Sequence, residues 1–312
     1  MAKPAHLEPS KLGTREYWDA LYTTEIANHA HDPSDTGTAW FDDSDAEAKL
    51  LEFLEEPDRA RELGLDTATT SFLDLGTGNG ALLFALRDAR WEGPMLGVDY
   101  SAQSVRFARR IERARRKEGA EGVEDSSSNK GEAEEEDTAG NNEREAGGDV
   151  DVHFVEHDIL HTPATALLSA GFSPSVVGGW DVVLDKGTFD AISLSAETLD
   201  GTDNTDTHVN ANTATDDMGM RPRRIHEAYG ARILPLVREG GLFLITSCNW
   251  TEAELRSWFE GDGAVYTTPT AHEPAYWGFE VVGRVEYRSF CFGGAKGQTI
   301  SSLCFRKVRK SR

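Results

Sequence analysis

A short apolar strand pattern runs directly into a loop of three alternating glycines in the segment Ser71–Gly80. The glycines are Gly76, Gly78 and Gly80, and an acidic residue, Asp74, stands two positions before the first of them. Because glycine has no Cβ atom, the backbone can turn sharply out of the strand and lie against a bound molecule where a helix then begins. The loop therefore predicts an α/β fold with a nucleotide-like cofactor at the end of this strand.

Strand and helix patterns alternate along most of the remaining chain, which is typical of an α/β protein. The expected strands are Ser71–Leu75, Met95–Asp99, Val152–Glu156, Asp181–Leu184, Leu242–Thr246, Glu280–Phe292 and Thr299–Val308, and the expected helices are Ala81–Ala89, Ala102–Lys117, Ile225–Val237 and Glu252–Glu260. The pattern predicts a doubly wound, mostly parallel seven-stranded sheet of the Rossmann-like type. Its last two strands, joined by the turn Gly293–Gln298, predict an antiparallel C-terminal hairpin at the edge.

Two polar segments without periodicity interrupt this alternation, at residues 118–149 and 196–224. The first contains twelve acidic and two basic residues, and the second is rich in Thr, Asn and Asp. Such compositions bury too little apolar surface to offset the entropy of ordering, so both are expected to be disordered insertions without catalytic residues. They would interrupt the main domain, residues 61–312, while residues 1–60 form an extension and a helix that packs on it.

The amino-terminal part of the chain is rich in aromatic residues and leads into a helix-capping pattern. The aromatic residues are Tyr17, Trp18, Tyr22, Trp40 and Phe41. They must pack on the domain, and Trp40 and Phe41 could also wall a cofactor pocket. Ser44 and Glu47 match the Ser-x-x-Glu capping box, which predicts a helix over about Asp45–Leu54.

The formal net charge of −22 argues against direct binding of a nucleic acid, because Lys and Arg side chains that neutralise phosphates supply most of that affinity. No apolar run reaches the roughly 18 residues of a membrane span, and the amino terminus lacks the apolar stretch of a signal peptide. The three cysteines, Cys248, Cys291 and Cys304, form neither a zinc pattern nor a disulfide framework. We therefore expect a cytoplasmic protein without a metal site.

The glycine loop alone fits two cofactors. Its spacing also matches a nicotinamide-dinucleotide site, with Asp99 near the position of a ribose-binding acid. Asp74 favours S-adenosylmethionine, because a carboxylate beside the loop repels a pyrophosphate and attracts an ammonium or sulfonium group. Asp99 and Asp158, at the ends of the next two strands, could accept hydrogen bonds from ribose and adenine. The candidate cofactor-binding residues are Trp40, Asp74, Gly76, Gly78, Gly80, Asp99, Tyr100, Asp158 and Ile159.

The fourth expected strand ends in the sequence Asp-Lys-Gly-Thr-Phe-Asp, from Asp185 to Asp190. Its polar end would lie at the carboxyl edge of the sheet, beside the expected position of the transferred methyl group. Asp185 is therefore the candidate catalytic residue, whereas Asp190 is expected to cap a helix. Lys186 could pair with a neighbouring acid and is not assigned to catalysis.

Four blocks of the chain together resemble the seven-strand, class I lysine methyltransferases that modify translation elongation factor 1A. The blocks are Ser10–Asp19, Asp35–Glu47, the glycine loop and Asp185–Leu194, and the resemblance extends from about Ser10 to Val308 apart from the two insertions. It implies mono- and dimethylation of one lysine of that factor in the cytoplasm. It also implies cofactor contacts at Asp74, Gly76, Gly78, Asp99 and Asp158, with Asp185 beside the reaction site. Our hypothesis for the mechanism is that Asp185 orients the target amine while a water path removes its proton.

Two other functions are open at this point. The same cofactor site could serve a small-molecule or nucleic-acid methyltransferase, although the fourth strand is not followed by the Asn-Pro-Pro-aromatic signature of enzymes that methylate the amino groups of bases. The chain could also be a noncatalytic protein that binds S-adenosylmethionine. The intact glycine loop and the three acids argue against this last alternative.

Overall fold

The computed structural model describes residues 4–121, 152–169, 178–199, 223–260, 266–270, 273–292 and 295–310. Most of both expected insertions lies outside these ranges. The described ends of the second insertion are tied together, because the Leu199 N–H donates a hydrogen bond of 2.9 Å to the Arg223 carbonyl oxygen. None of the helices within the described ranges is long and apolar enough to cross a membrane.

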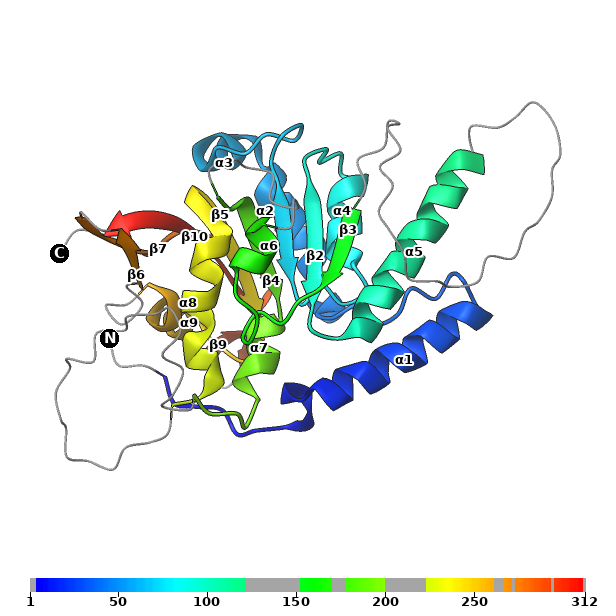
Figure 1. Cartoon of the computed structure of the whole chain (residues 1–312), viewed down its shortest axis with the longest axis horizontal. Coiled ribbons are helices and arrows are strands. Elements are labelled where there is room, and N and C mark those ends of the chain that lie inside the picture. The colour runs from blue at the N-terminus through cyan, green and yellow to red at the C-terminus, as the bar shows by residue number, and fades with distance from the viewer. Residues whose placement is uncertain are drawn as a thin grey trace.

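A mixed, mostly parallel sheet forms the centre of the molecule (Figure 1). Its strands are β1 (Phe72–Leu75), β2 (Met95–Asp99), β3 (Val152–Glu156), β4 (Trp180–Lys186), β5 (Val237–Ser247), β6 (Tyr266–Thr270), β7 (Glu273–Val285) and β10 (Ser301–Lys310). The order is β3-β2-β1-β4-β5-β10-β7-β6; the first five are parallel, and β10, β7 and β6 follow in antiparallel pairs. The expected fold class is confirmed, with β6 as an additional edge strand.

Helices cover both faces of this sheet and bury two apolar clusters. The helices are α1 (Arg15–His31), α2 (Ala46–Glu55), α3 (Pro57–Leu63), α4 (Ala81–Asp88), α5 (Ala102–Glu121), α6 (Thr165–Ser169), α7 (Thr188–Ser193), α8 (Tyr229–Ile233) and α9 (Glu252–Phe259). Side chains alternate along the strands, so that Phe72 packs with α2, α4 and α5 on one face. Leu73 packs with α6, α7, α8 and α9 on the other.

The helix expected over Ile225–Val237 is broken into short pieces. It consists of the 3₁₀ turn η3 (Ile225–Ala228), α8 and the 3₁₀ turn η4 (Leu234–Leu236), and Val237 already begins β5. Pro235 lies in η4 and has no N–H to continue an α-helix. The large apolar residues of this segment are buried, but the predicted length of the helix is wrong.

The strand expected over Glu280–Phe292 is also interrupted. β7 ends at Val285, and β8 (Ser289–Phe292) pairs with β9 (Ala295–Gln298) in a separate two-stranded hairpin. β8 is the end of the expected strand, and β9 lies within the expected turn Gly293–Gln298. Tyr287 lies between β7 and β8, and its side chain is buried in the core. Its hydroxyl lies 2.7 Å from the Ser302 hydroxyl. This buried contact takes the chain out of the sheet.

The helix expected after Ser44 forms as α2, but its capping box does not. Asp45, the residue before the helix, has a left-handed φ angle of 52°, and its side chain makes no capping hydrogen bond. The Ser44 hydroxyl instead lies 2.7 Å from the Thr299 hydroxyl. Ser44 closes a 3₁₀ turn, η2 (Asp42–Ser44), that docks the segment before α2 onto the start of the last strand.

The long helix α1 crosses the sheet at the carboxyl ends of its parallel strands (Figure 1). It packs along α5, where the His29 and Phe107 rings meet edge to face at 5.7 Å between centroids. The 3₁₀ turn η1 (Lys11–Gly13) precedes it. Because ligands of open α/β sheets bind at the carboxyl ends of the strands, α1 covers the edge where a site is expected.

Candidate active site

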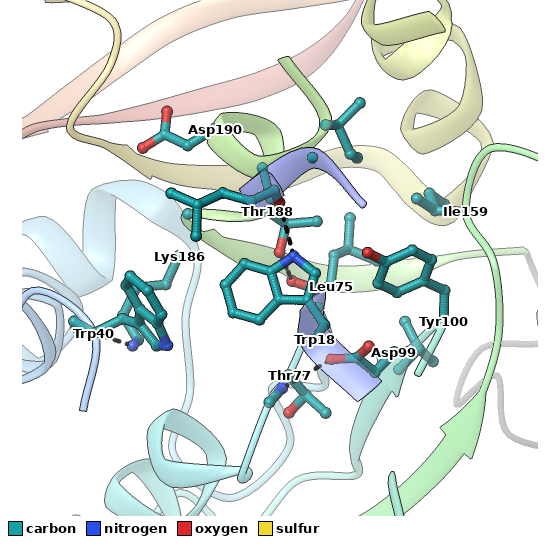
Figure 2. Close-up of a pocket in the computed structure, with 18 of the residues that line it drawn as sticks. Trp18, Trp40, Leu75, Thr77, Asp99, Tyr100, Ile159, Lys186, Thr188 and Asp190 are labelled. Carbon is teal, nitrogen blue, oxygen red and sulfur yellow. Dashed lines mark hydrogen bonds between the residues drawn. The ribbon is translucent and has the colours of Figure 1, made fainter. Parts of the chain in front are cut away.

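A cavity of about 460 Å³ lies at the carboxyl ends of β1, β2, β3 and β4 (Figure 2). Among the predicted cofactor-binding residues, those that line it are Trp40, Asp74, Gly76, Gly78, Asp99, Tyr100, Asp158 and Ile159. Gly80 and Asp185 are not among its lining residues. Tyr100 and Ile159 mark one end, here called the Tyr100 end, and Lys186 marks the other, with Trp18 between them.

The glycine loop is shaped by protein contacts as well as by its turn. Gly76 and Gly78 have φ angles of 63° and 60°, in the left-handed region that favours glycine. A Cβ atom on Gly76 would lie 2.0 Å from the Thr188 hydroxyl oxygen, and one on Gly78 would lie 2.7 Å from the Tyr22 hydroxyl oxygen. Gly80 faces two buried phenylalanine rings instead. It therefore serves the packing behind the loop.

Asp99 ties the glycine loop to the start of α5. Its carboxylate accepts hydrogen bonds from the Gly78 N–H at 3.1 Å, the Ser101 N–H at 2.9 Å and the Ser104 hydroxyl at 2.8 Å. Burial raises the pKa of Asp99, and these donors oppose the rise because they favour the charged form. The carboxylate is thereby fixed at the wall of the cavity, where the sequence predicted a ribose-binding acid.

Asp74 is the buried acid beside the loop, with 3% of its surface exposed. Burial raises its pKa to about 7; the charges of Glu47 and Asp99 add to this rise, and the charge of Lys186 opposes it. A positively charged ligand in the cavity would favour the ionised carboxylate and lower this pKa. Binding of such a ligand should therefore release a proton from the site near neutral pH.

Asp158 joins the end of β3 to α1 at the Tyr100 end. Its carboxylate accepts hydrogen bonds from the Leu160 and His161 N–H groups and lies 3.1 Å from the Arg15 guanidinium. Although burial opposes the shift, the charge and hydrogen bonds of His161 lower the pKa of Asp158. Arg15 also donates to the Tyr100 carbonyl oxygen and lies 4.7 Å from the centre of the Tyr100 ring. A single side chain of α1 thus holds two predicted cofactor-binding residues.

We expect Arg15→Ala to weaken cofactor binding about tenfold, because it removes a charge-assisted hydrogen bond and a cation–π contact at the Tyr100 end. Calorimetric titration with S-adenosylhomocysteine measures this change. Arg61→Ala is the matched control, since Arg61 forms an exposed ion pair with Asp58 and does not line the cavity. Equal affinities for the two variants would contradict the role of Arg15 at this end.

Polar and aromatic side chains from several elements line the cavity on the side of Lys186 (Figure 2). Asp190, on α7, accepts hydrogen bonds from the Ser247 hydroxyl and, at 2.7 Å, from the Cys248 N–H at the end of β5. Burial raises the pKa of Asp190, and these donors oppose the rise. Trp40 and Phe41 line the same region. An amine that entered here would meet aromatic rings and a carboxylate already oriented by two donors.

The structure places Asp185 behind the cavity. The residue is 1% exposed, and its carboxylate accepts hydrogen bonds from the Thr188 N–H at 2.8 Å and the Tyr229 hydroxyl at 2.6 Å. It therefore holds the start of α7, which is the role the sequence suggested for Asp190, whereas Asp190 is the acid that lines the cavity. The expected contact between Asp185 and an amine has no counterpart in this arrangement.

Asp185→Asn should change how stability depends on pH. Burial raises the pKa of Asp185 to about 7 from 3.8, so between these values the folded protein holds a proton that the unfolded chain releases. The stability contributed by this group is thus present below about pH 4 and lost as the pH rises through about 7. Asn does not titrate, so the free energy of unfolding of Asp185→Asn should gain about 2 kcal/mol or more relative to wild type over this window.

Asp181→Asn, on the same strand, should show the opposite sign. Burial opposes the shift, but the Ser71 hydroxyl and N–H and the Arg238 guanidinium lower the pKa of Asp181. The stability that Asp181 contributes is therefore lost as the pH falls through its pKa in the folded state. The free energy of unfolding of Asp181→Asn should rise relative to that of wild type as the pH is lowered. Urea unfolding at several pH values measures both variants. Parallel pH profiles for wild type and Asp185→Asn would refute the predicted titration.

The residues around the cavity fit a cationic nucleoside better than a dinucleotide. Among the described lining residues the lysine and arginine side chains are Arg15 and Lys186, and each is paired with a carboxylate, Asp158 and Glu47. Neither is therefore free to neutralise a pyrophosphate, and Asp74 beside the loop would repel one. The carboxylates that line the cavity fit S-adenosylmethionine, which carries an ammonium and a sulfonium group.

Sequence reasoning missed the part that α1 plays in this site. Arg15, Trp18, Asp19 and Tyr22 recur at helical spacing on one face of α1. Arg15, Trp18 and Tyr22 line the cavity, and Asp19 accepts a hydrogen bond from the Ser101 hydroxyl at the start of α5. The spacing of these residues was the available signal. It required the segment to be recognised as a helix first.

Comparison with known proteins gives concordant matches. Residues 66–284 match the family model of the methyltransferase domain. The chain is 32% identical to the protein-lysine N-methyltransferase EFM4 of Saccharomyces cerevisiae, over 98% of this chain and 99% of that protein. The corresponding enzyme of Schizosaccharomyces pombe is 32% identical, over 96% and 95% of the two chains. The EEF1A lysine methyltransferase 2 of Homo sapiens is 27% identical, over 96% and 88%.

Proposed function

Because the chain belongs to the methyltransferase-domain family and, within it, to the protein-lysine methyltransferases, we propose that it methylates a lysine of translation elongation factor 1A. S-adenosylmethionine is its methyl donor. The products we propose are the mono- and dimethylated lysine. The location we propose is the cytoplasm.

The cavity is the observation that carries this proposal. Its acids suit a cationic nucleoside, and its Lys186 end offers aromatic rings and the Asp190 carboxylate to an amine. The residues that would hold the cofactor are Trp40, Asp74, Gly76, Gly78, Asp99, Tyr100, Asp158 and Ile159. The relatives named as methyltransferases of elongation factor 1A match nearly the whole chain, which supports the same acceptor here.

When bound, S-adenosylmethionine supplies a methyl group on a positively charged sulfur, which an uncharged amine can attack. The protein's task is to position the amine and to favour its uncharged form. With an ordinary pKa of about 10.4, roughly one lysine in two thousand is uncharged at neutral pH. Enclosure by Trp40 and Phe41 would lower this pKa by excluding water, whereas the Asp190 carboxylate would raise it. Because two donors already hold Asp190, we assign it orientation of the amine, with the proton released to water.

The charge of the chain supports a protein partner over a nucleic acid. At a net charge of −22 the molecule attracts basic protein surfaces and repels phosphate backbones. This attraction is screened over about 8 Å at physiological ionic strength, so it steers the approach of the partner more than it fixes the final contacts. We therefore propose no direct contact with nucleic acid during the reaction.

Methyl transfer in a purified system tests the proposal. The full-length protein is incubated with elongation factor 1A and S-adenosylmethionine carrying a labelled methyl group, and the peptides are mapped by mass spectrometry. One lysine carrying one and two methyl groups is the expected result. Incubation with a cell lysate distinguishes the alternatives: label in RNA or metabolites would indicate a different methyltransferase, and absence of label despite cofactor binding would indicate a noncatalytic protein.

A further inference from the structure

We propose that Lys186 is a positioning residue that holds Trp40 and Phe41 as a wall for the target lysine; this role rests on the proposed function. Lys186 ends β4, and its side chain is 14% exposed at the cavity. Its ammonium donates a hydrogen bond of 3.2 Å to the Trp40 carbonyl oxygen (Figure 2). The same ammonium lies 3.2 Å from the Glu47 carboxylate. Lys186 thus connects the sheet to residues 38–46, the segment that leads into α2 and is called the turn below.

The backbone of this turn adopts conformations that must be held. Phe41 has a φ angle of 66°, in the left-handed region that a bulky residue rarely adopts, and Asp45 has one of 52°. Such residues persist where the surrounding structure fixes them, and they concentrate at functional sites. The Phe41 ring also lies against Gly187, where a Cβ atom would come within 3.1 Å of it. Lys186 therefore holds the backbone at Trp40, and Gly187 packs against the ring of Phe41.

The Lys186 ammonium differs from that of an exposed ion pair, because it is mostly buried and has two partners in the protein. Burying an ammonium group is costly unless it is paired and hydrogen-bonded, and Lys186 meets both conditions through Glu47 and Trp40. Trp40 in turn contacts Trp18, with 5.3 Å between ring centroids, so the wall continues into the middle of the cavity. Loss of the ammonium would free the Trp40 carbonyl and leave Glu47 without its partner.

Removal of Lys186 should affect the reaction with the protein substrate more than the binding of the cofactor. A misplacement of about 1 Å at a reacting group can cost on the order of 100-fold in rate. We expect removal of Lys186 to lower kcat/KM for elongation factor 1A at least tenfold. Affinity for S-adenosylhomocysteine should fall by a smaller factor than kcat/KM, because Trp40 is one of eight proposed cofactor-binding residues and those of the Tyr100 end keep their own contacts.

The experiment compares the double variant Lys186→Met/Glu47→Gln with the single variant Glu47→Gln. Glu47 is changed in both, so that removal of Lys186 does not leave an unpaired carboxylate. Lys49→Met is the matched control, because Lys49 forms an ion pair with Glu52 on the exposed side of α2. Three quantities are measured: kcat/KM for the elongation factor, affinity for S-adenosylhomocysteine, and hydrogen–deuterium exchange of residues 38–46. We expect the double variant to lose the most kcat/KM and to exchange fastest in this segment. Glu47→Gln should lose less, because the hydrogen bond from Lys186 to the Trp40 carbonyl oxygen remains. Lys186→Arg should retain part of both.

Three results would overturn the proposal. They are unchanged kcat/KM in the double variant, an equal loss in Glu47→Gln, and a loss of cofactor affinity as large as the loss of kcat/KM. The exchange measurement needs no substrate. If the wild-type protein failed to methylate the elongation factor, the proposed function would fall, while faster exchange on loss of Lys186 would still establish that this residue holds the turn.

Discussion

Asp99→Asn should weaken cofactor binding on the order of 100-fold and lower the free energy of unfolding by about 2 kcal/mol. Asp99 accepts three hydrogen bonds, from Gly78, Ser101 and Ser104. An amide offers one acceptor oxygen, and its NH₂ group must face at least one buried donor. Because the Gly78 N–H belongs to the glycine loop, the loss displaces the part of the backbone that lies against the cofactor. Calorimetry with S-adenosylhomocysteine and urea unfolding measure the two effects.

Asp66→Asn is the matched control for this substitution. Asp66 accepts a hydrogen bond of 2.8 Å from the N–H two residues ahead, as Asp99 does from Ser101, but it is exposed and outside the cavity. Its cofactor affinity should equal that of the wild type. Binding by Asp99→Asn within about threefold of wild type would show that the loop needs no carboxylate at this position, and the assignment of Asp99 would fall.

The sheet, and the meeting of the predicted acids in one cavity at its edge, followed from short-range patterns. Parallel strands end at one edge, so acids at successive strand ends had to meet there, and Asp74, Asp99 and Asp158 all line the cavity. The spacing of the glycines alone fitted two cofactors and did not specify a reaction. The family resemblance supplied the reaction. These inferences succeeded because each depends on the local sequence and on one general rule of sheet topology.

The Asp185 and Asp190 assignments show what local patterns cannot decide. Both acids lie within six residues of the same strand end, and either could cap α7. The choice depends on Tyr229 and Ser247, which approach from distant parts of the chain and bind Asp185 and Asp190 respectively. The same holds for Ser44, where a contact with Thr299 outweighed the capping box. Long-range hydrogen bonds decided all three cases.

Gly76→Ala should cost about 2–5 kcal/mol of stability and most of the cofactor affinity. A left-handed φ costs a non-glycine residue about 1–2 kcal/mol, and overpacking adds about 1–3 kcal/mol, because the new Cβ would lie 2.0 Å from the Thr188 hydroxyl oxygen. Gly64→Ala isolates the first contribution, since Gly64 has a φ angle of 75° but nothing within 4 Å of its Cβ position. Urea unfolding should therefore separate the variants by the packing cost. If they unfold alike, backbone conformation alone accounts for the glycine at position 76.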